Sequence, residues 1–172
     1  MKKKICNNQP FAKRSFLIIY YIALLSFTTF STKAGDSISI IPRPLTMQVH
    51  NGHFVLNNST VVATSASYAD IIQTMEWFTN KIASSTGYHL SSKKSSKDEI
   101  NLILNTKADT SLHEEGYTLK VTPSRVTIIA NKPAGIFYGL QTLLQLLPPQ
   151  IASVSEVKDV KWTMPCVDIK DV

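Results

Sequence analysis

The side chains in this sequence that could bind a metal are its histidines, and two of them lie close together. His50 and His53 flank the dipeptide Asn51-Gly52, so their imidazoles could face each other across a tight turn. A zinc site needs three or four protein ligands. No carboxylate or thiolate stands beside these two histidines in the sequence. We therefore interpret them as solvated turn residues and predict no metal site.

Carboxylate pairs that could act as acid and base occur at Asp98-Glu99 and Glu114-Glu115. Neighbouring side chains diverge in an extended chain, whereas hydrolysis of a glycosidic bond needs two carboxyls that converge to about 5 to 10 Å. The sequence also lacks an HExxH zinc motif, a GxSxG nucleophile elbow and a glycine-rich phosphate loop. We assign both pairs to the surface, and the residues taken alone show no active site.

The first 34 residues have the organisation of a secretory signal peptide. The polar stretch Met1 to Arg14 is followed by an uncharged apolar run, Phe16 to Phe30. At about 1.5 Å per residue this run reaches roughly 22 Å, less than the ~30 Å hydrocarbon core of a bilayer. Thr32 and Ala34 are small residues at the −3 and −1 positions of a cleavage site before Gly35. We predict an exported chain that begins at Gly35, with no membrane contact after cleavage; the alternatives are a buried helix or an uncleaved anchor.

The charge of the chain comes from the same segment. The sequence has 18 Lys and Arg against 12 Asp and Glu, a formal net charge of +6. Six cations and no acidic residue lie in the first 34 residues, so 12 cations and 12 anions remain. A neutral mature domain gives no reason to expect binding to nucleic acid.

The mature part is long enough for one ordinary domain. Its 138 residues are fewer than the roughly 200 that a (β/α)8 barrel requires. It holds one cysteine, Cys166, which can form no internal disulfide and is interpreted as a small apolar strand residue. Stability must therefore come from the hydrophobic core.

The patterning predicts several strands. Leu45 to Leu56 predicts a β-hairpin around Asn51-Gly52, because Asn-Gly supplies the positive φ angles of a type I′ turn. Thr60 to Thr64 predicts a further strand at the same edge of the sheet. Three more are expected at Ile100 to Asn105, Gly116 to Thr122 and Arg125 to Ala130, the last two as an antiparallel hairpin.

Two amphipathic helices are also predicted. The first begins with Ser67 as N-cap and ends near Thr86, with Gly87 in the left-handed position that follows a helix. The second begins with Asn131 as N-cap and ends at Pro148-Pro149. Gly135 and Gly139 lie one turn apart in it, which indicates close approach to a strand or a neighbouring domain. We expect an α+β domain over 35–150, with a mostly antiparallel sheet and both helices on one face.

Some segments together resemble a known family. They are Ile41-Pro42-Arg43-Pro44, the strand pair GYTLKV and RVTIIA, and GIFYGLQTLLQLL over 135–147. They are similar to the amino-terminal, zincin-like domain of bacterial family 20 β-N-acetylhexosaminidases, and the run from Pro165 to Asp171 resembles the strand that approaches that family's catalytic barrel. The resemblance covers roughly residues 40 to 172, with 151–172 as linker and approach strand.

The resemblance implies a glycosidase background. Such enzymes are exported, to the periplasm, the outer membrane or the medium, and remove terminal β-linked N-acetylhexosamine without a metal or organic cofactor. Their catalytic Asp-Glu pair and sugar-binding arginine belong to the barrel and its approach, so no residue of this chain is expected to be catalytic or substrate-binding. We expect a non-catalytic accessory domain, inactive alone, whose partner is the catalytic barrel of the same enzyme.

Three residues are candidates for the contact with that barrel: Tyr138, Trp162 and Pro165. We expect part of this set to lie in an exposed apolar patch above ~400 Å². Trp162 is equally compatible with a place in the core. The alternative function is a free-standing carbohydrate-binding or protein-interaction module. Sugar binding favours clustered aromatic side chains, whereas Phe54, Tyr88 and Trp162 come from different elements.

Overall fold

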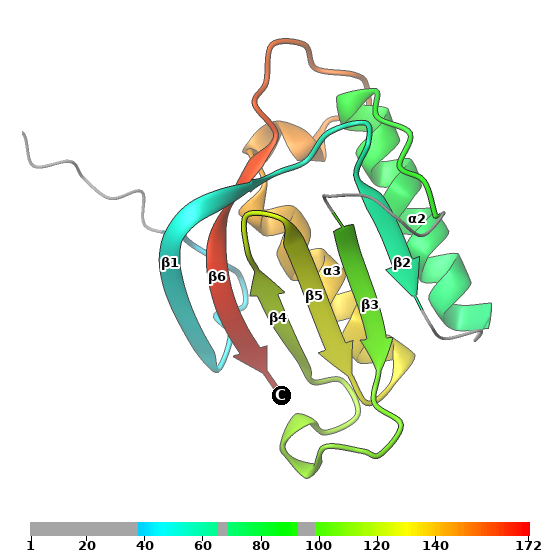
Figure 1. Ribbon diagram of the computed structural model, residues 1–172, viewed down its shortest axis with the longest axis vertical. Helices are drawn as coiled ribbons and strands as arrows, with labels where there is room; N and C mark the ends of the chain where they lie inside the picture. Colours follow the sequence, from blue (N-terminus) through cyan, green and yellow to red (C-terminus); the bar gives the residue numbers. More distant parts are fainter. Residues whose placement is uncertain (1–37, 65–68, 93–98) are drawn as a thin grey trace, which may run out of the picture. The chain divides into compact units, whose positions relative to one another are not determined.

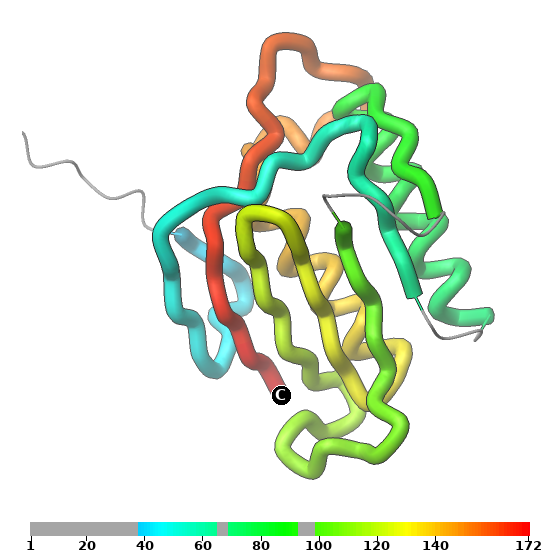
Figure 2. Tube along the Cα trace, in the orientation of Figure 1, coloured from blue at the N-terminus to red at the C-terminus, as the bar shows by residue number. Residues whose placement is uncertain are grey.

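The computed structural model describes residues 38–64, 69–92 and 99–172, which Figures 1 and 2 show in colour. Within them lies one sheet of six strands in the order β1-β6-β4-β5-β3-β2. The strands are β1 (Thr46–Val55), β2 (Val61–Thr64), β3 (Glu99–Leu104), β4 (Tyr117–Val121), β5 (Arg125–Ala130) and β6 (Thr163–Asp171). The signal-peptide prediction falls on residues outside the described ranges.

The sheet is mixed. β1, β6, β4 and β5 pair antiparallel in succession, and β3 runs parallel to both β5 and β2. The parallel pairs arise because a helix connects β2 to β3 and the antiparallel hairpin places β5 beside β3. The predicted hairpin of β4 and β5 is therefore confirmed.

Two helices cover one face of the sheet, as Figure 1 shows. They are α2 (Ala69–Thr86) and α3 (Pro133–Leu146). Gly87 has φ +72° and its N–H donates to the Ala83 carbonyl at 2.9 Å, so it ends α2 as predicted. The predicted N-cap Ser67 lies outside the described residues.

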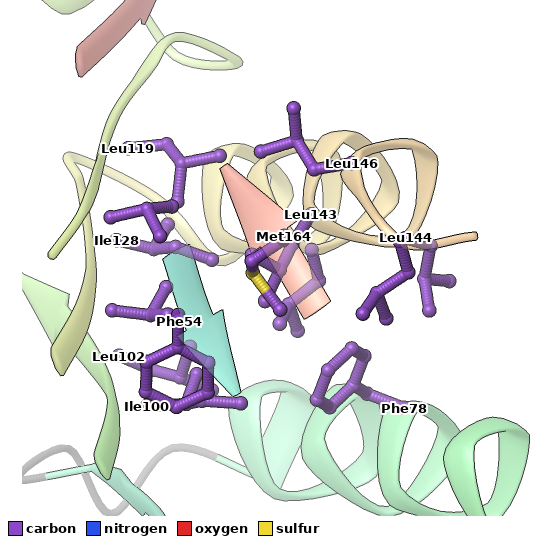
Figure 3. Close-up of a cluster of buried hydrophobic side chains, with 14 of the residues drawn as sticks. Phe54, Phe78, Ile100, Leu102, Leu119, Ile128, Leu143, Leu144, Leu146 and Met164 are labelled. Carbon is purple, nitrogen blue, oxygen red and sulfur yellow. The ribbon is translucent and has the colours of Figure 1, made fainter. Parts of the chain in front are cut away.

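The core lies between the sheet and these helices. Figure 3 shows Leu143 and Leu144 of α3 and Phe78 of α2 packed against strand side chains that include Phe54 and Met164. Alternation along β4 places Tyr117, Leu119 and Val121 on this covered face. Two short 3₁₀ turns, Thr110–Leu112 and Pro149–Ala152, complete the described elements.

Close packing of α3 on the sheet depends on its two glycines. A Cβ on Gly135 would lie 2.3 Å from the Gly116 carbonyl oxygen, and one on Gly139 would lie 2.6 Å from a methyl of Ile128. The expectation of close approach to a strand is confirmed, since Gly116 precedes β4 and Ile128 is in β5.

The hairpin prediction around Asn51-Gly52 is wrong. Thr46 to Val55 form one strand that pairs with β6 along its length. The register shifts between Val49 and His53, so the dipeptide lies in a bulge rather than a turn. Gly52 alone of the two has a positive φ, +103°, whereas a type I′ turn needs two.

Two further predictions of local structure are corrected. β1 and β2 lie at opposite edges of the sheet, because β6 from the carboxyl end of the chain pairs with β1. Lys132, and not Asn131, occupies the N-cap of α3, and it forms no side-chain capping bond. The carboxamide of Asn131 instead bonds to Asn105, to both backbone groups of Asp109 and to the His113 carbonyl.

Candidate interdomain surface

The segment that precedes β1 is fixed against α3 by one side chain. The Ile41 N–H donates to Gln145 Oε1 at 2.9 Å, and Gln145 Nε2 donates to the Ile41 carbonyl at 3.0 Å. Both backbone groups of Ile41 are thus satisfied by a single carboxamide. Ile41 and Gln145 belong to the two motifs, IPRP and GIFYGLQTLLQLL, that are 104 residues apart in the sequence.

A second bond fixes the end of the same segment. The Leu45 N–H donates to Asp171 Oδ1 at 3.1 Å, and Asp171 is the last residue of β6. Pro44 between these two anchors is buried. Residues 41–45 are therefore held between α3 and the carboxyl end of β6.

This arrangement leaves a hollow of about 400 Å³ beside the carboxyl end of the described chain. Its rim carries apolar side chains that face solvent: Ile41 is 77% exposed, Tyr138 42% and Val172 49%. The rest of its lining is mostly polar or acidic and includes Gln141, Gln145, Glu115 and Asp171. A surface that combines exposed apolar side chains with hydrogen-bonding groups suits contact with another protein surface.

An aromatic row extends this surface across the helices. The Trp77 ring of α2 lies 5.3 Å from the Phe137 ring of α3, and Phe137 lies 5.7 Å from Tyr138 with near edge-to-face geometry. Trp77 and Tyr138 are both partly exposed. We call the set Trp77, Phe137, Tyr138, Ile41 and Val172 the helix-side surface.

The structure separates the three predicted contact residues. Tyr138 lies in the helix-side surface. Trp162 is 3% exposed and belongs to the core, so it offers little area to a neighbouring domain. Pro165 is half-buried in β6, opposite His53 of β1, and does not line the hollow beside Tyr138.

Sequence reasoning missed four members of this surface: Trp77, Phe137, Ile41 and Val172. An isoleucine before a proline in an irregular segment gives no periodic signal, and its exposure follows from the Gln145 clamp. Three apolar residues alternate at the outer edge of the sheet and are exposed: Leu45 just before β1, and Met47 and Val49 within it. The incorrect hairpin prediction assigned them to its first strand.

Behind the hollow, Tyr117 forms a buried hydrogen bond to a helix residue. Its hydroxyl lies 2.5 Å from the Thr142 hydroxyl, and both residues are nearly fully buried. Burial raises the pKa of Tyr117 above its ordinary value of 10.0, because the charged phenolate is disfavoured away from water. This bond ties β4 to the middle of α3.

The opposite face of the sheet is not covered by either helix. It carries an open groove of about 630 Å³ over β1, β6, β4 and β5. The groove contains polar and charged side chains, and none of the described residues that line it is aromatic: its side chains include Thr118, Lys120, Thr127, Asp168 and Lys170. Stacking of a sugar ring has no platform there.

Charged groups on this open face pair with one another. Asp168 Oδ2 lies 3.2 Å from His50 Nε2 and 3.3 Å from Lys120 Nζ. Among the described residues no group of three His, Cys, Asp or Glu side chains is placed to hold a metal ion. His50 and His53 lie on one strand and do not face each other across a turn. No metal-binding or catalytic cluster forms here in the part of the chain that the structure describes.

The remaining reactive side chains are also accounted for. Glu114 and Glu115 are exposed, as predicted, and Glu99 lies 3.7 Å from Arg125; Asp98 falls outside the described residues. Cys166 is buried, and burial raises the pKa of its thiol, which disfavours the reactive thiolate. In residues 38–64, 69–92 and 99–172 no helix is long and apolar enough to span a membrane.

Comparison with known proteins assigns this fold to a family. Residues 37–172 match the model of glycosyl hydrolase family 20, domain 2. The chain is 33% identical over 157 residues to a beta-hexosaminidase from Porphyromonas gingivalis. The matched region covers 86% of this chain and 20% of that relative. A beta-hexosaminidase from Vibrio vulnificus is 28% identical over 125 residues, 72% of this chain and 14% of the relative.

Solved structures agree with the sequence relatives. The N-acetyl-beta-hexosaminidase of Streptomyces plicatus superposes with a TM-score of 0.67 at 28% identity, over 77% of this chain and 26% of that one. The family 20 enzyme of Streptomyces coelicolor gives 0.68 at 27% identity over the same shares. The chain thus spans about a quarter of these structures and a fifth of its first curated relative. The catalytic barrel of the multidomain enzymes is absent from this chain, which belongs to glycosyl hydrolase family 20 as its domain 2.

Proposed function

We propose that this domain is the non-catalytic accessory domain of an exported β-N-acetylhexosaminidase, and that it supports the catalytic barrel of that enzyme. The observation that carries the proposal is the family match over residues 37–172, joined to a helix-side surface whose apolar side chains are exposed next to the carboxyl end of β6. The barrel would bury this surface.

The chemistry of the chain supports a structural role. Among the described residues no group of three His, Cys, Asp or Glu side chains is placed to hold a metal ion, and Asp168 of the open face is paired with His50 and Lys120. Burial of part of Trp77, Tyr138 and Ile41 against a barrel would release about 25 cal/mol for each Å² of apolar surface removed from water. The domain would thereby stabilise the barrel without taking part in the reaction.

Export is the second part of the proposal. The cationic stretch, the apolar run of 15 residues and the small residues before Gly35 support cleavage between Ala34 and Gly35. Expression of the full chain in a bacterium with a periplasm should yield a product whose amino-terminal residue is Gly35. Replacement of Leu24 and Leu25 by Asp should leave the uncleaved chain in the cytoplasm; equal export of the variant would contradict this part.

Activity and sugar binding separate the proposal from its alternatives. Purified chain should not hydrolyse a chromogenic β-N-acetylglucosaminide, and titration with chitooligosaccharides should show no saturable binding. Hydrolysis that co-purifies with the chain and survives a second purification would show an independent enzyme. Saturable binding without hydrolysis would favour the carbohydrate-binding module instead.

A further inference from the structure

The bulge in β1 places a reactive dipeptide at the surface. Asn51 and Gly52 are exposed, and they lie in the interval where the pairing of β1 with β6 shifts register. The ladder pairs Val49 with Val167 and His53 with Pro165, so neither Asn51 nor Gly52 has a partner residue on β6. The backbone of this dipeptide is thus outside the regular ladder that would hold it in place.

The carboxamide of Asn51 is also unrestrained. Within the described residues it forms no hydrogen bond, whereas the carboxamide of Asn131 forms four and that of Asn57 forms at least three, with the Ser59 N–H, the Ser59 hydroxyl and the Val55 carbonyl. Because Gly52 has no side chain, nothing on its own Cα blocks approach of its backbone nitrogen to the Asn51 side chain. Asn51 therefore differs from Asn57 and Asn131 in two ways: its carboxamide forms no hydrogen bond, and the residue that follows it is glycine.

We propose that Asn51 is a site of spontaneous covalent modification, and that its carboxamide is lost through a cyclic imide formed with Gly52. The Gly52 backbone nitrogen attacks Asn51 Cγ, a new C–N bond closes a five-membered ring, and ammonia leaves with the proton that the nitrogen gives up. Water then opens the ring at either carbonyl, which yields aspartate or isoaspartate. No oxidant, cofactor or enzyme is needed.

The product changes the charge of one end of the open sheet face. Asn51 lines a small pocket of about 240 Å³ together with His50, Lys120, Cys166 and Asp168. A carboxylate at position 51 adds a negative charge to the set in which Asp168 already contacts His50 and Lys120. Isoaspartate also lengthens the main chain, at a point where the bulge already interrupts the β1–β6 ladder.

The test is incubation of the purified full chain at neutral to mildly alkaline pH, followed by peptide mapping. The peptide that contains Asn51 should gain the mass difference between an amide and an acid, and an isoaspartyl methyltransferase should label part of it. Conversion should be several-fold faster at Asn51 than at Asn131 or Asn57 in the same sample. Equal or slower conversion at Asn51 would overturn the proposal.

A matched variant tests whether the carboxamide is lost through closure of a five-membered ring. Asn51→Gln keeps the carboxamide, but its ring closure would need six members, so the peptide should stay unmodified over the same period. Gly52→Ala is not used, because a side chain would strain the φ of +103° at this position. Circular dichroism before and after incubation checks that the wild type and Asn51→Gln both stay folded. Conversion of Asn51 only in chains that have lost their folded spectrum would also overturn the proposal.

Discussion

Gln145 holds Ile41 by both of its backbone groups, at 2.9 and 3.0 Å. This contact joins two motifs that are distant in the sequence, and it determines how the apolar rim of the helix-side surface is presented. The same face of α3 carries Gln141 one turn and Tyr138 two turns before Gln145. We call this pair of hydrogen bonds the Gln145 clamp; it fixes Ile41, whose exposed side chain belongs to the helix-side surface.

Loss of this clamp should destabilise the domain modestly. Gln145→Leu removes two exposed hydrogen bonds and should lower the free energy of unfolding by about 1 kcal/mol. Gln141→Leu is the matched control, because Gln141 lines the same hollow but forms no bond to residues 41–45 among the described contacts. Urea unfolding measures both variants, and an equal effect of the two would refute the clamp.

The role of Asn131 can be separated from helix capping. Its side chain ties the connection between β3 and β4 through Asn105, Asp109 and His113. Asn131→Ser keeps a good capping residue but cannot span these groups, so it should destabilise as much as Asn131→Ala, by about 1 to 3 kcal/mol. Hydrogen exchange of residues 105–116 should rise in both. Retention of wild-type stability by the serine variant would restore the capping interpretation.

The sequence correctly predicts those elements whose structure depends on residues close together in the chain. The periodicity of α3, the β4–β5 hairpin and the glycine that ends α2 each depend on a few neighbouring residues. The family motifs predict the fold. Of the helix-side surface, the sequence predicts only Tyr138 as a contact residue, because the geometry of this surface depends on a contact between residues 104 positions apart.

The errors have a common physical origin. Asn51-Gly52 favours a tight turn when the flanking strands have no other partner. Here β6, more than 100 residues later, pairs with both flanks and converts the turn into a bulge. Asn131 is a good helix-capping residue by type, yet four tertiary hydrogen bonds take its side chain elsewhere. Long-range pairing overrode local preference in both cases.

The contact of α3 with the sheet should not tolerate a methyl group at Gly135. Its Cβ would lie 2.3 Å from the Gly116 carbonyl oxygen and 2.7 Å from Ala130 Cβ. Gly135→Ala should therefore lower the free energy of unfolding by about 1 to 3 kcal/mol. Glycine to alanine inside a helix otherwise stabilises by about 1 kcal/mol, so a rise in the melting temperature would contradict the packing described.

Alkaline pH should weaken the domain through Tyr117. Burial raises its pKa above 10.0 in the folded state, so its stabilising contribution is complete below pH 10 and falls as the pH rises through the folded-state pKa. Tyr117→Phe removes this dependence. The difference in unfolding free energy between wild type and variant should shrink above pH 10 in urea titrations. A difference independent of pH would show that the hydroxyl is not held in its neutral form.

The most direct test of the accessory role is the thermal half-life of a family 20 catalytic barrel produced without its own domain 2, measured with and without this chain. We expect a longer half-life with the chain at unchanged turnover per active barrel. Tyr138→Glu should abolish this protection, and Ile103→Glu, which alters a similarly exposed residue of the open sheet face, should not: the exposures are 42% and 36%. An unchanged half-life with the wild-type chain, or equal loss in both variants, would contradict the account.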